Sequence, residues 1–420
     1  MINLISANTS TRVSTATPDA HPRIRSALTR EPVVLLGGFE ATISVMRSLA
    51  RTGVPVDVLT GDVGLGTVMR HSRHCRRLVP APHDNVQEEW LEWLLQNASH
   101  QGSVVLPCSD DGLELIANHR STLTQWGYRT VPANDEVVLK MLNKERSYEL
   151  ARKIGISSPR TVVVTEVDEF EAAADKIGFP CAMKPIYKHH HAQALRWKAV
   201  RITDTSEASR RLVAQALQHG PQQFTEIVPG PEDQYFSYYT YIGDSGEPVF
   251  EVTKQKWRQY PVGFGDGTYH VSISDSEAAD LGRRFCRGVG IRGLAVVEFK
   301  RDLDDGQLKL IECNPRFVGG NELMRVAGLD IAQLVYARAV GEDDPDMTRY
   351  EEGLTLWRPF KDLLAFTRLR RRREIGLALW FRQIARLHNF QIFSWSDPVP
   401  GLLTPLYRIP DLVRRGLPRS

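Results

Sequence analysis

Apolar positions near the start of the chain change their spacing repeatedly, which predicts strands and helices in alternation. Residues 33–36 are four successive apolar residues, typical of a short buried strand. Residues 41–52 carry apolar side chains at helical spacing, and residues 54–59 form a second strand-like run just after Gly53. A strand, a helix and a second strand joined by short turns form a βαβ unit, so we expect a doubly wound parallel sheet here.

The same pattern extends the first domain to about residue 133. Residues 104–107 are a further strand, and two aspartates at the start of the next helix either cap it or hold an amine. Gly37 and Gly38 follow the first strand, but their spacing differs from that of a dinucleotide-binding turn. We therefore predict a Rossmann-like domain over residues 32–133 and assign no dinucleotide to it.

Past this domain the pattern mixes helices and strands in a different order. Residues 134–230 begin with a helix over 135–154 and continue as a small α+β lobe. Residues 231–353 are richer in strands and are predicted to form a second lobe. Residues 1–31 have Ser/Thr-rich patches and are expected to be a disordered extension. The predicted fold class is thus α/β and α+β, followed by an extension over residues 354–420.

Length and composition describe a chain with several cores. The 420 residues fit two or three domains, and 42% hydrophobic with 25% charged residues is typical of a soluble globular protein. No run of about 18 apolar residues exists, and the N-terminal segment lacks the apolar region of a secretory signal. The five cysteines are scattered without metal-ligand spacing, so we expect reduced thiols and a cytoplasmic protein.

The formal net charge of +3 hides a basic C-terminal extension. Residues 354–420 hold twelve arginines and one lysine against four acidic residues, so their net charge is +9 and that of the remainder is −6. Aromatic residues are interspersed with these arginines, which suits either an anionic membrane surface or a helical domain packed on the body. No nucleic-acid recognition module accompanies the charge, so nucleic acid is not among the expected partners.

Two acidic residues on a predicted hairpin indicate a cation site. Residues 301–306 form a turn, and a hairpin centred on residue 305 places Glu298 opposite Glu312. Their carbons would lie about 5 Å apart, where two carboxylates repel unless one is protonated or a cation lies between them. Asn314 can add an amide oxygen on the same side, and such ligands suit Mg²⁺ bound together with phosphates. The alternative is a pair of solvated surface glutamates.

Four ordered segments resemble the motifs of the ATP-grasp superfamily. The two strands of this hairpin, which end in Asn314-Pro315-Arg316, resemble its metal-binding signature. Three motifs precede it in the expected order: Asn143-Lys144 at a helix start, Gly178 to Pro185 around a lysine, and Thr225 to Gly230 between the lobes. The resemblance runs from about Val33 to Val340 and implies an ATP-grasp fold after the Rossmann-like domain. Within the superfamily, the segments around Cys108 and Lys256 are similar to D-aspartate ligase-like carboxylate–amine ligases.

The resemblance implies that ATP binds between two lobes. Two lysines, one at a helix start and one on an apolar strand, would meet the phosphates as point charges. The hinge backbone would pair with adenine, a hinge glutamate would reach the base amine, and a second glutamate would bind the ribose hydroxyls. The alternative for the strand lysine is that it lies at an exposed edge of the sheet and binds no nucleotide. The alternative for the second glutamate is that it lies in an exposed loop. The residues given these roles are Lys144 and Lys184; Glu226, Ile227 and Val228; Glu232; and Lys198 as a further cation.

A basic strand and an arginine are expected on the substrate side. Lys254, Lys256 and Arg258 alternate along one predicted strand, so they share a face and suit phosphates, a carboxylate substrate or both. Arg316 would neutralise charge on the transferred phosphate, as the resemblance implies. A solvated basic strand and a capping arginine are the alternatives. Residues 187–198 contain no glycine, unlike the flexible loop of many family members, so their role as a phosphate lid is left open.

The resemblance implies an ATP-dependent carboxylate–amine ligase that forms an amide through an acyl-phosphate and releases ADP and phosphate. Mg²⁺ is the expected metal with Mn²⁺ as an alternative, the expected partners are a small carboxylate and a small amine, and a homodimer is left open. Two other functions stay open: an ATP-grasp enzyme with another acceptor, such as a carboxylase, and a non-catalytic nucleotide-binding protein. No biotinyl-lysine context is present, and the sequence does not identify the acid or the amine.

Overall fold

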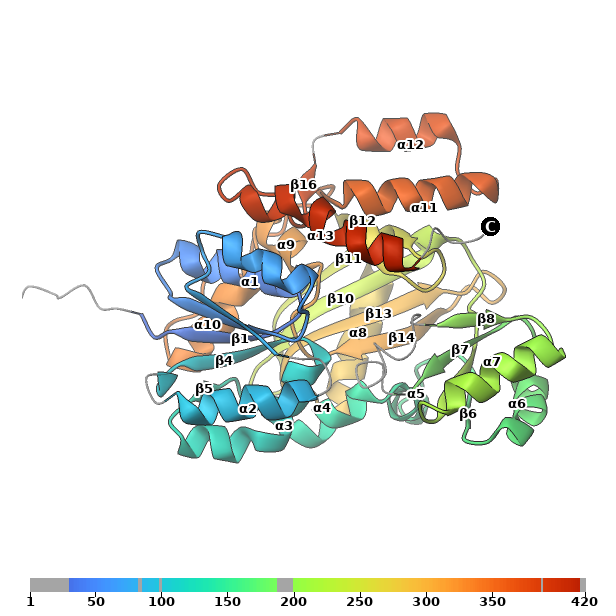
Figure 1. The fold of residues 1–420 in the computed structure, drawn as a ribbon, viewed down its shortest axis with the longest axis horizontal. Helices are drawn as coiled ribbons and strands as arrows, with labels where there is room; N and C mark the ends of the chain where they lie inside the picture. The colour runs from blue at the N-terminus through green and yellow to red at the C-terminus, as the bar shows by residue number, and fades with distance from the viewer. Residues whose placement is uncertain (1–29, 82–84, 98–99, 187–198, 387, 416–420) are drawn as a thin grey trace, which may run out of the picture.

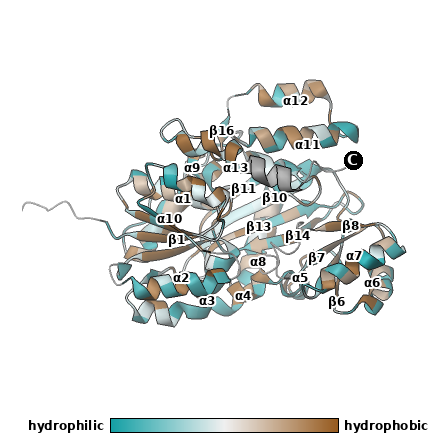
Figure 2. Cartoon of the chain, viewed as in Figure 1, coloured by the Kyte–Doolittle hydropathy of each residue, from teal (hydrophilic) through white to brown (hydrophobic). Residues whose placement is uncertain are grey.

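The computed structural model describes residues 30–81, 85–97, 100–186, 199–386 and 388–415, with side chains up to residue 407. Three sheets organise this part of the chain, and in Figure 1 the largest lies between the other two. Every helix among the described residues falls short of the length and apolar character that crossing a membrane requires. Figure 2 shows brown, apolar stretches along β1 (Val33–Gly37) in the first sheet and on α12 (Leu377–Ile384), a helix of the C-terminal extension.

The first sheet is parallel and has the strand order β3-β2-β1-β4-β5. Its central strands are buried along their whole length, which explains their nearly continuous apolar runs. The strand order reverses at β1, and parallel sheets of this kind bind ligands beside such a reversal. The strands are β1 (Val33–Gly37), β2 (Val56–Thr60), β3 (Arg77–Pro80), β4 (Val104–Cys108) and β5 (Arg129–Thr130); the helices are α1 (Glu40–Arg51), α2 (Val86–Gln96) and α3 (Asp110–Gln125).

The single helix predicted over residues 135–154 is in fact two helices. The first, α4 (Asp135–Leu142), ends at Asn143, whose extended backbone interrupts the helical path. Asn143 Oδ1 then caps α5 (Lys144–Lys153) by accepting a hydrogen bond from Arg146 N at 3.1 Å. The interruption places Lys144 at the first position of α5, from which its side chain reaches the largest sheet.

The smallest sheet is antiparallel, with the order β6-β9-β7-β8. Two helices pack on it through a separate apolar core that includes Phe170, Val213 and Phe224. Its strands are β6 (Thr161–Val164), β7 (Cys181–Pro185), β8 (Val200–Ile202) and β9 (Gln222–Glu226), and its helices are α6 (Phe170–Ile177) and α7 (Glu207–Leu217).

The largest sheet has the order β14-β13-β10-β11-β12-β15-β16. One apolar core joins it to the first sheet, because Ile43 and Met46 of α1 share a cluster with Tyr239 of β10 and Leu323 of α9. The strands are β10 (Tyr235–Ile242), β11 (Pro248–Tyr260), β12 (Asp266–Ile273), β13 (Gly293–Arg301) and β14 (Leu308–Asn314); the helices are α8 (Ser276–Val289), α9 (Asn321–Val326) and α10 (Ile331–Val340).

The C-terminal extension packs on the body through the edge of this sheet. Its first strand pairs antiparallel with β12, and its second strand pairs with the first. Two helices lie between these strands along the chain, and a third helix comes after them. All three lie along one side of the molecule in Figure 1. The elements are β15 (Thr355–Trp357), α11 (Pro359–Arg371), α12 (Leu377–Ile384), β16 (Asn389–Phe390) and α13 (Val399–Arg415).

Candidate functional site

A pair of glutamates lies across the β13–β14 hairpin. Glu298 pairs directly with Glu312, which confirms the predicted register at this position. The pairing depends on a bulge, because the ladder passes from Glu298–Glu312 to Phe299–Leu310 and leaves Ile311 as an extra residue. Without this extra residue Glu298 would face Ile311. The bulge therefore brings two carboxylates onto the same face of the hairpin.

Each of these carboxylates binds a lysine from another element. Lys144 Nζ lies 2.7 Å from Glu312 Oε2, and Lys256 Nζ lies 3.1 Å from Glu298 Oε1. Burial on its own would lower the pKa of Lys144, but the attraction of Glu312 outweighs it and the pKa lies above its ordinary value. Lys144 is therefore charged at neutral pH, and the two lysines supply the positive charge that paired carboxylates require.

Asn314 and Arg316 continue the site past the end of β14. Asn314 Nδ2 donates to Glu312 Oε1 at 3.1 Å, and Asn314 Oδ1 accepts from Arg316 Nη2 at 3.1 Å. Arg316 Nε also donates to Asp110 Oδ1 at 2.6 Å, whereas the cap of α3 comes from Ser109 Oγ. The first of the two aspartates thus holds an arginine, and this arginine ties the first sheet to the carboxylate pair.

Lys254 is buried on β11 beside a histidine and the ring of a tyrosine. Its Nζ lies 3.2 Å from His270 Nδ1 and 5.7 Å from the ring centre of Tyr239. Burial lowers the pKa of Lys254 to about 8 against the opposing pull of Glu298, and burial holds the pKa of His270 well below its ordinary value. His270 is therefore neutral and accepts from Lys254. Sequence reasoning missed His270 because only the pairing of β11 with β12 brings the two residues together.

Arg258 is bound to another element instead of this group, and the substrate role predicted for it stays a prediction. Its guanidinium forms a bidentate ion pair with Asp362 of α11, with Nε–Oδ1 and Nη2–Oδ2 distances of 2.7 and 3.0 Å. The two side chains are 2% and 0% exposed. The register shifts between Lys256 and Arg258, leaving Trp257 as an extra residue, and the C-terminal extension supplies the acid. Arg258 therefore anchors that extension to β11.

Two residues hydrogen-bond to the hinge after β9, Lys300 through its side chain and Arg160 through its backbone amide. Lys300 Nζ donates to the Val228 carbonyl at 2.8 Å, and the Glu226 carboxylate accepts from Arg160 N at 3.0 Å. Recognition of adenine by Glu226, Ile227 and Val228 stays a prediction. These bonds limit it, because the Val228 carbonyl and the Glu226 carboxylate already accept hydrogen bonds from the protein.

Glu232 carries a buried oxygen that lacks a partner. The residue is 9% exposed, and its Oε2 has no hydrogen-bond partner among the described residues. Burial raises the pKa of Glu232, against the opposing effect of Lys256. A buried acceptor left unpaired costs stability, so a ligand hydroxyl would be favourable here. The position fits the predicted ribose contact, which stays a prediction.

The structure describes one of the two remaining predicted cations. Lys184 of β7 places its Nζ 5.7 Å from the ring centre of Tyr148. Tyr148 lies one helical turn after Lys144 on α5, so both lysines predicted to bind phosphates approach the same tyrosine. Lys198, with the rest of segment 187–198, lies outside the described residues.

The oxygen atoms of the hairpin suit Mg²⁺ that arrives with phosphates. Within the described ranges, no group of three or more His, Cys, Asp or Glu is arranged to hold a metal ion through protein ligands alone. In nucleotide sites Mg²⁺ is usually bound by one or two carboxylates together with phosphate oxygens. Glu298 and Glu312 form such a pair, and the Asn314 amide is hydrogen-bonded to it. This donor set fits Mg-ATP.

Comparisons with known proteins match parts of this chain. A family model described as ATP-grasp in the biosynthetic pathway with Ter operon matches residues 245–358. A D-alanine–D-alanine ligase of Ectopseudomonas mendocina is 27% identical over 209 residues, covering 47% of this chain and 64% of the ligase. An alanine–anticapsin ligase of Bacillus subtilis is 24% identical over 277 residues, covering 60% of this chain and 57% of that ligase.

A solved structure extends the likeness to the fold. The carboxyaminoimidazole ribonucleotide synthase of Aspergillus clavatus, complexed with ATP, superposes with a TM-score of 0.59 at 15% identity over 78% of this chain and 81% of that one. The family-model match over residues 245–358 and the two ligases support the resemblance of this chain to the ATP-grasp superfamily. The ATP-grasp family model covers the basic strand and both hairpin glutamates, whereas Lys144, Lys184 and the hinge precede it. The chain spans less than two thirds of the length of the two ligases.

Proposed function

We propose that this protein is an ATP-dependent carboxylate–amine ligase. A substrate carboxylate attacks the γ-phosphate of ATP, which gives an acyl-phosphate and ADP. An amine then attacks the acyl carbon and releases phosphate, leaving an amide. The observation that carries the proposal is the Glu298–Glu312 pair, in which each carboxylate already binds a lysine from another element. Such chemistry depends chiefly on positioning and charge neutralisation.

The carboxylate pair has a defined role in this proposal. Glu298, Glu312 and Asn314 would hold Mg²⁺, or Mn²⁺ in its place, together with phosphate oxygens. The ion would neutralise charge on the phosphates during transfer. Because Lys144 lies against Glu312, its ammonium group is in position to bind phosphate at the same place, and Lys184 would add a second charge.

Three further residues would act on the acceptor side. Arg316, which bridges Asn314 and Asp110, offers a planar set of donors for the transferred phosphoryl group. Lys254 and Lys256 lie on the same strand face as Glu298 and would bind the substrate carboxylate or the acyl-phosphate. Arg258 takes no part in this proposal.

The matched relatives support amide formation between small molecules. Both are ligases whose names include alanine, so an amino acid is a reasonable first substrate to test here. The likeness to D-aspartate ligase-like enzymes stays a prediction, and the acid and amine remain to be identified. Because the fold is shared with a carboxyaminoimidazole ribonucleotide synthase, the carboxylase alternative is tested in the same assay. Bicarbonate is included there as a possible acceptor of the phosphoryl group.

The test is release of ADP by the purified protein with Mg-ATP and a panel of amino acids, other carboxylates and bicarbonate. Hydroxylamine traps an acyl-phosphate as a hydroxamate, so a ligase is expected to form hydroxamate whenever ADP appears without an amine. Glu312→Gln should lower ADP release at least 100-fold. Glu277→Gln, which changes an exposed acid on α8, is the matched control and should leave the rate within twofold.

Two outcomes separate the alternatives. ADP release that depends on bicarbonate and never on another carboxylate would favour the carboxylase. ATP binding with no ADP release on any member of the panel would favour a non-catalytic nucleotide-binding protein. Full turnover by Glu312→Gln would contradict the role given to the carboxylate pair.

A further inference from the structure

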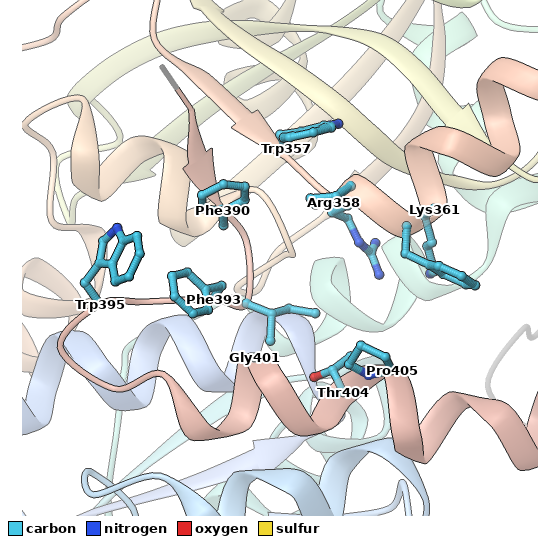
Figure 3. Close-up of a pocket in the computed structure, with 12 residues that line it drawn as sticks. Trp357, Arg358, Lys361, Phe390, Phe393, Trp395, Gly401, Thr404 and Pro405 are labelled. Carbon is cyan, nitrogen blue, oxygen red and sulfur yellow. The ribbon is translucent and has the colours of Figure 1, made fainter. Parts of the chain in front are cut away.

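A cavity of about 340 Å³ lies between the edge of the largest sheet and the C-terminal helix α13. Figure 3 shows its walls: β15 and the start of α11 on one side, the chain after β16 on another, and Gly401, Thr404 and Pro405 of α13 opposite. Five aromatic side chains dominate the lining. They are Trp357, Phe360, Phe390, Phe393 and Trp395. The surface that a ligand would meet is therefore largely apolar and rich in aromatic rings, which favours an apolar group.

One end of this cavity is basic. Arg358 lines it and is 6% exposed, and the acceptor that its guanidinium reaches among the described residues is Glu40. A guanidinium has five N–H donors, so this buried cation can bind a further anionic group. Lys361 adds a second cation, whose Nζ lies 3.4 Å from Asp266 Oδ2 and 3.8 Å from Glu40 Oε1, so that Arg358 and Lys361 share Glu40. In addition, the buried Trp357 Nε1 has no hydrogen-bond partner within the described part of the chain.

The basic end faces the catalytic residues proposed above. A side chain at Gly319 would meet Glu40 Cβ at 3.6 Å, and one at Gly320 would meet Lys254 Cε at 2.9 Å. This two-glycine turn therefore lies against both Glu40, the partner of Arg358, and Lys254. Arg358 N also donates to the Thr268 carbonyl of β12 at 2.9 Å, and His270, two residues further along this strand, lies 3.2 Å from Lys254 Nζ.

We propose that this cavity binds the apolar group of an amphipathic carboxylic acid, which is the acid that the ligase activates. Its carboxylate would lie at the Arg358 end, toward Lys254, and its aromatic group would lie among the tryptophans and phenylalanines. The volume suits one such group. The inference rests on the proposed ligase function and adds the class of the acid substrate. The cavity itself is formed by the C-terminal extension at the edge of the sheet.

Titration of the full-length protein with 3-phenylpropionate, in the absence of ATP, tests this site by calorimetry. Propionate, which lacks the phenyl group, should bind at least tenfold more weakly. Thr404→Phe fills the cavity from α13 and should weaken 3-phenylpropionate binding at least tenfold. Leu402→Phe adds an aromatic ring on the same helix at a residue that is 64% exposed and outside the cavity lining, so its affinity should stay within twofold.

A second variant guards against a folding defect in Thr404→Phe. Lys361→Met removes a charge at the basic end and should weaken binding of 3-phenylpropionate while leaving 3-phenylpropanol unaffected. Wild-type ADP release should rise at least tenfold with 3-phenylpropionate over propionate, and Thr404→Phe should lose that difference. Equal binding of the two acids, or unchanged binding by both variants, would overturn the inference even if small acids still support ADP release. Binding without ADP release for any acid would instead contradict the ligase function.

Discussion

Lys144 Nζ lies 2.7 Å from Glu312 Oε2, although the two residues are 168 positions apart in the sequence. The contact exists because Asn143 ends one helix and caps the next, which sets Lys144 at the start of α5. On the other side, the bulge at Ile311 turns Glu312 toward Glu298. Two local irregularities thus create the charge pairing on which the proposed site depends.

Lys144→Met should weaken ATP binding roughly tenfold, because one charge that meets the phosphates is lost and Glu312 is left without its lysine. Titration calorimetry with ATP and Mg²⁺ would measure the change. Lys140→Met alters a half-exposed lysine on α4 whose partner is Glu136, and it serves as the control. Equal ATP affinity in the two variants would remove Lys144 from the nucleotide site.

Glu232→Gln should weaken ATP binding roughly tenfold, because a charged acceptor binds a hydroxyl more strongly than a neutral one does. The sharper readout compares ATP with 2′,3′-dideoxy-ATP. Wild-type protein should prefer ATP, and the variant should bind both nucleotides alike. A preference for ATP that survives the substitution would place the ribose contact elsewhere.

Lys254 should make activity depend on pH. Since its pKa is lowered by burial to about 8, it carries charge below that pH and loses it above, so the KM for the carboxylate should rise about tenfold per unit above pH 8. Lys254→Met should raise this KM at every pH and flatten the profile. A profile that keeps its shape in the variant would assign the titration to another group.

Stability should follow the same group with a definite sign. Between pH 8 and the ordinary lysine value of 10.5, the unfolded chain holds the Lys254 proton and the folded protein does not. Lys254 therefore destabilises the folded state below pH 8, and this penalty falls as the pH rises toward 10.5. Urea unfolding of wild type and Lys254→Met at pH 7 and pH 10 would isolate the contribution, with the larger gain from the substitution at pH 7.

The Arg258–Asp362 pair should matter for folding and not for nucleotide binding. Asp362→Asn leaves a buried arginine without its charge partner, so it should lower the free energy of unfolding by about 3 kcal/mol or more. Arg283→Gln breaks a partly exposed pair with Glu251 and should cost under about 1 kcal/mol. Urea denaturation measures both. A loss of ATP affinity in Asp362→Asn under conditions where it stays folded would contradict the structural role.

Much of the site could be predicted because it depends on local spacing. The turn over residues 301–306 identifies the hairpin, and the predicted pair of Glu298 and Glu312 is found in the structure, but the ladder beside the turn pairs Phe299 with Leu310 and only the bulge at Ile311 brings Glu312 opposite Glu298. The apolar runs of β1 and β2 likewise identify buried strands. The strands and the hairpin are determined by residues close together along the chain, whereas the bulge that completes the glutamate pair was not predicted.

The rest depends on contacts between distant segments. Arg258 was placed with Lys254 and Lys256 because strand periodicity was assumed to continue, whereas the ladder slips at Trp257 and Asp362 lies more than 100 positions away. His270 could be recognised only once β12 was paired beside β11. Bulges and partners of this kind leave no periodic signal in the sequence.

Calorimetric titration with ADP, with and without Mg²⁺, tests the central claim most directly. In the wild-type protein Mg²⁺ should tighten ADP binding at least tenfold, because Glu298 and Glu312 would hold the ion against the phosphates. In the Glu298→Gln/Glu312→Gln double variant, ADP should still bind and the effect of Mg²⁺ should vanish. An effect of Mg²⁺ that is the same in both proteins would contradict the assignment of these two carboxylates as the metal site.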